Sequence, residues 1–173
     1  MNFDEDNVAS AYKDYEAWTI DRKRAWVTLF SGAHYDIIDF SITIYSETGT
    51  DSSQKYLRGW FRNLSAYIHT VDIVKGKPVS GWLKEKPGNV LEAVFAIPGK
   101  DYNIYLADER ELTDKDAGQP IHGKIRLDLP PGSYEIRAYS SETGLYSPGH
   151  KISGAKDIEF STPEIGSLYF FGR

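Results

Sequence analysis

Apolar residues stand at every second position in two stretches, 125–129 and 134–138, which Pro130-Pro131-Gly132 separates. This two-residue period is that of a strand with one buried face. A Pro/Gly break between two half-buried strands predicts an antiparallel hairpin. A chain with this pattern is expected to form antiparallel sheet, and the neighbouring segments are expected to supply its other strands.

Short segments of the same kind recur from residue 90 to the end of the chain. They are rich in β-branched and aromatic residues and are bounded by Gly, Pro, Ser or Asp, the residues that form turns. Short strands at regular spacing are typical of a β-sandwich. The seven expected strand segments are 90–97, 102–107, 122–129, 134–139, 145–152, 158–160 and 168–171.

The N-terminal half has helical periodicity instead. Apolar residues recur three and four positions apart from Leu57 to Val71, which predicts a helix with one broad apolar face. Asp51 or Ser52 is expected to cap its N-terminus. Another helix is predicted within 12–30, where Trp18, Trp26 and Leu29 lie on one stripe of three- and four-residue spacing. Gly32 follows where a left-handed C-cap residue is favoured. A short strand is expected within 33–45, and the first ten residues are expected to be weakly ordered.

These patterns predict the α+β class, with two N-terminal helices and a short strand followed by an antiparallel β-sandwich of seven strands. The change from helical to two-residue periodicity lies near the glycines of segment 81–88. We therefore expect a helical segment at 1–80 and a β-sandwich domain at 81–173.

Composition narrows the classes of partner. The net charge is −5, and the densest basic cluster is the short run Arg22-Lys23-Arg24. Phosphate binding uses clustered Lys and Arg, so no nucleic-acid partner is expected. The first residues are acidic where a signal peptide is basic, and no apolar run reaches the roughly eighteen residues of a membrane span. A soluble chain without a membrane partner is expected, and its compartment is left open.

Metal and cofactor chemistry has little support. The chain has no Cys, which excludes disulfides and thiolate metal sites. Its four histidines are far apart in sequence and lack the spacing of metal ligands. No metal and no cofactor are expected.

Several motifs along the chain resemble segments of glycoside-hydrolase-like proteins. The run RAWVTLFSGAHY at 24–35 resembles the late helix and closing strand of their (β/α)8 barrels. Lys77-Pro78, the PGKDY run at 98–102 and the PPG-centred strands at 122–148 resemble the region that follows. The resemblance covers about residues 22–158, and it includes the group whose C-terminal piece is named a collagen-binding domain.

The resemblance implies that 1–80 is the end of a barrel and 81–173 an accessory sandwich. A complete barrel needs about 250 residues, and its two catalytic carboxylates usually lie on earlier strands. It therefore implies a terminal fragment or a non-catalytic C-terminal module that supports a barrel or contacts carbohydrate. No catalytic residue is assigned, and enzyme activity is not expected of this chain alone.

Two alternatives stay open. The chain is a small stand-alone glycosidase-like hydrolase if His34, Tyr35, Asp36 and Asp39, its densest group of chemically active side chains, line a substrate rim. Alternatively, it is a structural remnant that self-associates through the apolar face of the helix at 56–71.

Exposed aromatic rings are candidates for stacking on sugar rings. Trp82 lies in the linker region and is the tryptophan most able to reach the surface, and Tyr139 and Tyr146 are the other candidates. The remaining tryptophans, Trp18, Trp26 and Trp60, fall on helix stripes and are expected in the core.

Overall fold

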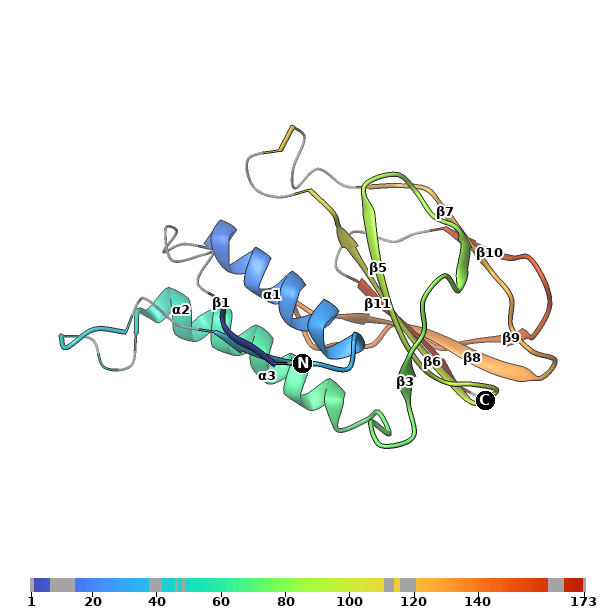
Figure 1. Ribbon diagram of the computed structural model, residues 1–173, viewed down its shortest axis with the longest axis horizontal. Helices are drawn as coiled ribbons and strands as arrows, with labels where there is room; N and C mark the ends of the chain where they lie inside the picture. The colour runs from blue at the N-terminus through green and yellow to red at the C-terminus, as the bar shows by residue number, and fades with distance from the viewer. Residues whose placement is uncertain are drawn as a thin grey trace.

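The computed structural model describes residues 2–6, 15–37, 42–45, 47, 49–110, 114–115, 121–161 and 167–172. It confirms the α+β class, with helices at one end of the molecule and antiparallel sheets at the other (Figure 1). The elements are β1 (Asn2–Asp6), α1 (Tyr15–Phe30), β2 (His34–Ile37), α2 (Asp51–Lys55), α3 (Leu57–Ile68), β3 (Lys77–Pro78), β4 (Leu83–Glu85), β5 (Val90–Ile97), β6 (Asp101–Asp108), β7 (Lys124–Leu127), β8 (Ser133–Ser140), β9 (His150–Ser153), β10 (Ile158–Ser161) and β11 (Ser167–Gly172).

The strands of the described residues form three sheets. A six-stranded antiparallel sheet has the order β3-β5-β6-β11-β8-β9, and a three-stranded antiparallel sheet has the order β10-β7-β4. β1 and β2 form a separate parallel pair. Within the large sheet, β5 and β6 pair along their whole length, and Gly99 in the turn between them has a φ of 78°.

The expected hairpin around Pro130-Pro131-Gly132 is wrong. β7 pairs with β4 and β10, whereas β8 pairs with β9 and β11. Proline has no backbone N–H to give to a strand ladder, and the chain here crosses from one antiparallel sheet to the other. Leu129 N–H donates to Ala155 O at 3.0 Å, and Gly154 N–H donates to Gly132 O at 2.7 Å, so neighbouring backbone holds the crossing.

The large sheet has a hydrophobic cluster on each face, because successive strand residues point to opposite sides. Val94 and Ala96 of β5 join a cluster with Ile125 and Leu127 of the small sheet. Ala93 and Phe95 of the same strand join a cluster with residues of α1 and α3. The chain is therefore layered as helices, large sheet and small sheet (Figure 1).

An aromatic cluster connects the helices to the large sheet. The Trp26 ring of α1 stacks on Tyr105 of β6, with ring centroids 5.6 Å apart and planes 17° apart. It also contacts Tyr67 of α3 at 5.1 Å, Tyr139 of β8 at 5.8 Å and Phe30 at 6.0 Å. The expected burial of Trp18, Trp26 and Trp60 is thus observed.

Several expected details differ from the structure. The described residues contain three helices rather than two, because α2 and α3 are separate at Tyr56. Thr50, not Asp51 or Ser52, caps α2, and its hydroxyl accepts the Ser53 N–H at 3.1 Å.

The strand count of seven is also too low. β3 and β4 precede the expected strands, so β3–β11 are nine strands in the part of the chain that is described. β1 forms within the first ten residues, which were expected to be weakly ordered. Its pairing partner β2 is about thirty residues away in sequence, so local sequence patterns do not predict the pairing of β1 with β2.

No helix among the described residues is both long and apolar enough to cross a membrane.

Trp26→Ala should lower the free energy of unfolding by about 3–5 kcal/mol, because it removes a large side chain that is 1% exposed and leaves a cavity between the layers. Urea unfolding followed by circular dichroism measures the change. The matched control is Tyr45→Ala, which truncates a ring that is 93% exposed and should cost less than about 0.5 kcal/mol. Equal effects of the two variants would contradict the account.

Candidate functional site

The parallel pair β1–β2 defines the edge where a functional site is expected. Asn2 pairs with His34 and Asp6 with Ile37, and α1 makes the crossover between the strands. In parallel β/α units, ligands bind at the carboxyl ends of the strands, where the following loops gather. A ligand of this unit is therefore expected at the carboxyl ends of β1 and β2.

The side chains of β2 alternate between the helices and the open face. The Tyr35 ring lies 6.1 Å from the Phe61 ring, and the Tyr35 hydroxyl donates to Asp21 Oδ1 at 3.2 Å. Ile37 packs against the cluster of Trp18, Leu57 and Trp60. His34 and Asp36 are exposed and point to the opposite face, as the two-residue period of a strand requires.

The structure therefore divides the four rim candidates. His34 and Asp36 share the open face of β2, whereas Tyr35 is directed toward the helices. Asp36 Oδ1 accepts the N–H of Ile37 at 2.9 Å. Asp39 lies outside the described residues. A glycosidase needs two carboxyl groups on either side of a substrate, and of this group only Asp36 has a described carboxylate.

The three aromatic candidates occupy different environments. Trp82 is half-buried, with its ring stacked 4.6 Å from that of Tyr102 and its Nε1–H donating to Asp128 O at 3.1 Å. Tyr139 is 2% exposed and lies inside the aromatic cluster. Tyr146 is 40% exposed, with its ring 4.7 Å from that of Tyr139. Of the three residues, Tyr146 has the largest exposed fraction.

The turn before Tyr146 is held by helix α3. Asn63 Nδ2 donates to Glu142 O at 2.9 Å and to Ser141 O at 3.4 Å. Gly144 lies against the same side chain, since a Cβ at this position would come within 2.7 Å of Asn63 Oδ1. The Tyr139 hydroxyl donates to Asn63 O at 2.9 Å. These contacts fix the position of Tyr146 relative to the helices.

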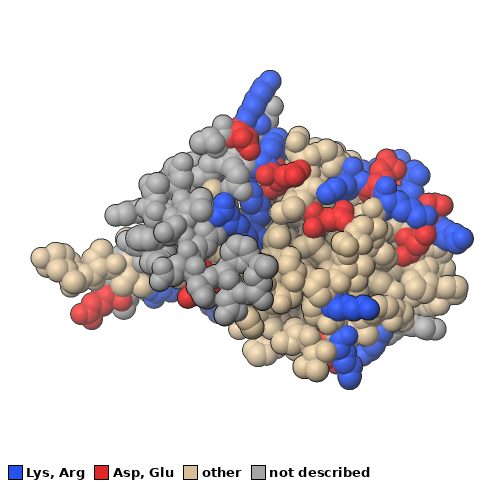
Figure 2. Space-filling model, in the orientation of Figure 1, with Lys and Arg blue, Asp and Glu red and all other residues tan. Residues whose placement is uncertain are grey.

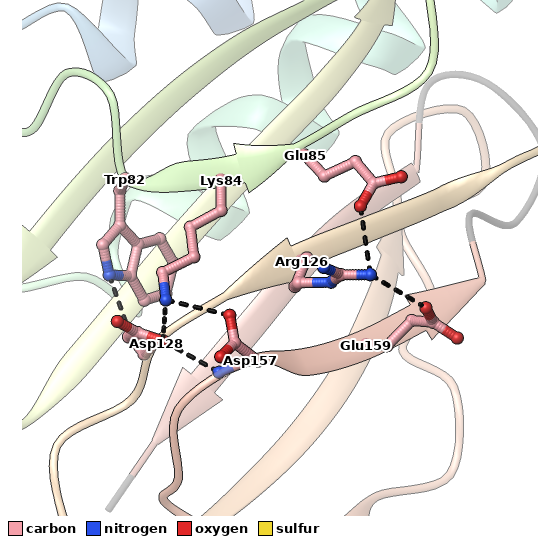
Figure 3. Close-up of polar contacts among 7 residues, drawn as sticks. All are labelled: Trp82, Lys84, Glu85, Arg126, Asp128, Asp157 and Glu159. Atoms are coloured by element: carbon pink, nitrogen blue, oxygen red, sulfur yellow. Dashed lines mark hydrogen bonds and ion pairs between the residues drawn. The ribbon is translucent and has the colours of Figure 1, made fainter.

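The outer face of the small sheet carries a set of ion pairs that the sequence analysis missed (Figure 3). Lys84 Nζ lies 2.7 Å from Asp128 Oδ1 and 2.9 Å from Asp157 Oδ1. Arg126 lies 3.2 Å from Glu85 Oε2 and 3.8 Å from Glu159 Oε2. The alternation in 124–128 signals a polar face, but it does not identify partners that are distant in sequence.

These charges compensate one another. Figure 2 shows Lys, Arg, Asp and Glu side chains intermingled at this end of the molecule. The hydrogen bond from Lys84 lowers the pKa of the Asp128 carboxyl, and the hydrogen bond to Asp128 raises the pKa of Lys84. The face is therefore a solvated network of pairs rather than a concentration of one charge.

The described part of the chain holds no metal-binding cluster, and the two phenols whose pKa values burial raises most lie in the core. No cluster of three or more His, Asp or Glu side chains there is arranged to hold a metal ion. Burial raises the pKa of Tyr105 to about 12 and that of Tyr67 well above its usual value. Both phenols stay neutral and belong to the core.

The chain is similar to known proteins in fold alone. No protein-family model and no curated protein sequence matches it. A glycoside hydrolase family 5 structure from Bacteroides vulgatus ATCC 8482 is similar over 87% of this chain, with a TM-score of 0.56 and 15% identity. A structure described as a glycoside hydrolase is similar over 91% of this chain, with a TM-score of 0.57 and 8% identity.

The matched region is a minor part of those proteins. This chain covers 35% of the first structure and 37% of the second. The resemblance to a portion of glycoside-hydrolase-like proteins, first indicated by sequence motifs, is thus confirmed at the level of fold.

Replacing Lys84 by Gln should raise the pKa of Asp128, because the ammonium that stabilises the carboxylate is lost. A carboxyl with a lowered folded-state pKa stabilises the fold above its unfolded value of about 3.9, and that contribution disappears as the pH falls through the folded pKa. Carboxyl ¹³C NMR titration measures the shift. Lys100→Gln is the control, since Lys100 pairs with Asp101, and an unchanged Asp128 titration in Lys84→Gln would contradict the pairing.

Proposed function

We propose that this chain is the non-catalytic C-terminal part of a glycoside-hydrolase-like protein. In this proposal, residues 1–80 are the end of a (β/α)8 barrel and residues 81–173 are an accessory β-sandwich. Its role is to support the barrel or to contact carbohydrate.

The parallel β1–α1–β2 unit is the observation that carries the proposal. Parallel sheets occur almost only with several strands and with both faces shielded from solvent. Here two parallel strands pair with each other, and among the described residues the helices pack on the face that carries Tyr35 and Ile37. Further parallel strands beside this pair would give it the neighbours such a sheet needs, and a barrel supplies them at both edges.

The polarity of the open face favours a barrel over an open sheet. His34 and Asp36 are exposed on this face, whereas a parallel sheet with helices on both sides is apolar on both. In a barrel the same face lines the interior, and side chains near the carboxyl ends of its strands contact the substrate. Asp36 lies next to the carboxyl end of β2, whereas His34 begins the strand.

A supporting role follows from the shared core. The helices of the first part pack on β5, β6 and β8 through the Trp26 cluster, and β3 pairs with β5. The proposed division at residue 80 therefore describes architecture rather than two independent cores. A sheet fixed to the last helices of a barrel in this way would brace them.

Two functions considered from the sequence have less support. The stand-alone hydrolase needs a second positioned carboxyl opposite Asp36. Self-association through α3 needs a free apolar stripe, but Leu57, Trp60, Leu64 and Tyr67 are buried within the chain itself.

The isolated chain should not hydrolyse glycosides. A glycosidase places an acid and a nucleophile on either side of the bound substrate, and no such pair is assigned in this chain. An aryl-glycoside panel assayed with the wild type and with the Asp36→Asn/Asp39→Asn double variant measures this. Any trace turnover should be the same in both proteins. Turnover that disappears in a double variant with an unchanged circular dichroism spectrum would contradict the proposal and favour the stand-alone hydrolase.

A further inference from the structure

The loop after β2 exposes three large apolar side chains within four residues. Tyr45 is 93% exposed, Ile44 is 82% exposed and Ile42 is 47% exposed. The Tyr45 N–H donates to the Thr43 hydroxyl at 3.3 Å, which ties the backbone of the loop locally. Grouped apolar side chains in contact with water mark surfaces that meet a ligand or partner.

The loop lies at the functional edge of the parallel unit. It follows the carboxyl end of β2, and the parallel pairing places the carboxyl end of β1 at the same edge. It projects from the body of the molecule at the left of Figures 1 and 2. Loops at this position carry ligand-binding groups in β/α proteins.

Charge indicates which ligand fits. Between Arg24 and Lys55 the sequence has no Lys or Arg, while it has the acids Asp36, Asp39, Glu47 and Asp51. Such a segment repels phosphates and other anions. A neutral polyhydroxyl ligand fits instead, because its apolar faces pair with aromatic rings and its hydroxyl groups donate to carboxylates.

We propose that the loop 42–45 is a carbohydrate-contact site in which the Tyr45 ring stacks on the apolar face of a sugar. Ile44 provides apolar surface beside the ring. This inference rests on the proposed function and adds a contact residue to it, separate in sequence from Tyr146. A second copy of the chain is the alternative occupant that the test must separate.

The test compares Tyr45→Ala with the matched variant Tyr146→Ala, using affinity gel electrophoresis with soluble xylan, mixed-linkage β-glucan and galactomannan as probes. Tyr45→Ala should weaken the binding of the wild type's preferred polysaccharide by about fivefold or more. Tyr45→Phe should bind like the wild type, because the ring and not the hydroxyl makes the contact. Circular dichroism checks that the variants are folded, which the exposure of Tyr45 leads us to expect.

Other outcomes overturn the inference in distinguishable ways. Binding that Tyr146→Ala abolishes and Tyr45→Ala preserves would refute the role of Tyr45 and leave the proposed function intact. Concentration-dependent dimerisation lost in Tyr45→Ala, with polysaccharide binding unchanged, would identify a second copy as the occupant. A wild-type chain that binds none of the three polysaccharides would contradict the carbohydrate contact in the proposed function, and the role of Tyr45 with it.

Discussion

The indole of Trp26 contacts aromatic rings from both long helices and from two strands of the large sheet. Phe30 lies on the same helix, Tyr67 comes from α3, and Tyr105 and Tyr139 come from the large sheet. β2 is attached to this helical layer through Tyr35 and Ile37 in turn. The large sheet therefore positions the helices, and the helices in turn position β2 and the loop that follows it.

Buried polar contacts make this packing specific. The Tyr67 hydroxyl donates to Asn103 Oδ1 at 2.5 Å, and Asn103 Nδ2 donates to Phe95 O at 3.1 Å. An apolar cluster alone tolerates sliding, whereas unpaired buried polar groups would cost about 1–3 kcal/mol each. These bonds, together with those of Asn63, fix how α3 lies on the sheet and hence how the open face of β2 is oriented.

Local periodicity predicted the elements better than their partners. β5 has the expected bounds, and the 3.6-residue period of α3 buries Leu57, Trp60, Leu64 and Tyr67 as expected. The two-residue alternation in 125–138 predicted two strands correctly but predicted the wrong pairing between them. A Pro/Gly break is compatible both with a hairpin and with a crossing from one sheet to another. Exposure also depends on distant packing: Tyr139 and Tyr146 look alike in sequence, yet only the former is buried by the helices. Tyr45, the residue proposed to contact a sugar, belongs to none of the sequence motifs.

The helices and the large sheet form one cooperative unit through the Trp26 cluster. Native-state hydrogen exchange followed by mass spectrometry tests this cooperativity most directly. Amides of α3 and of β6 should open with the same free energy, and that free energy should fall in parallel for both as urea is added. Opening of α3 at a distinctly lower free energy than β6 would show that the helical layer unfolds by itself. That result would contradict the account.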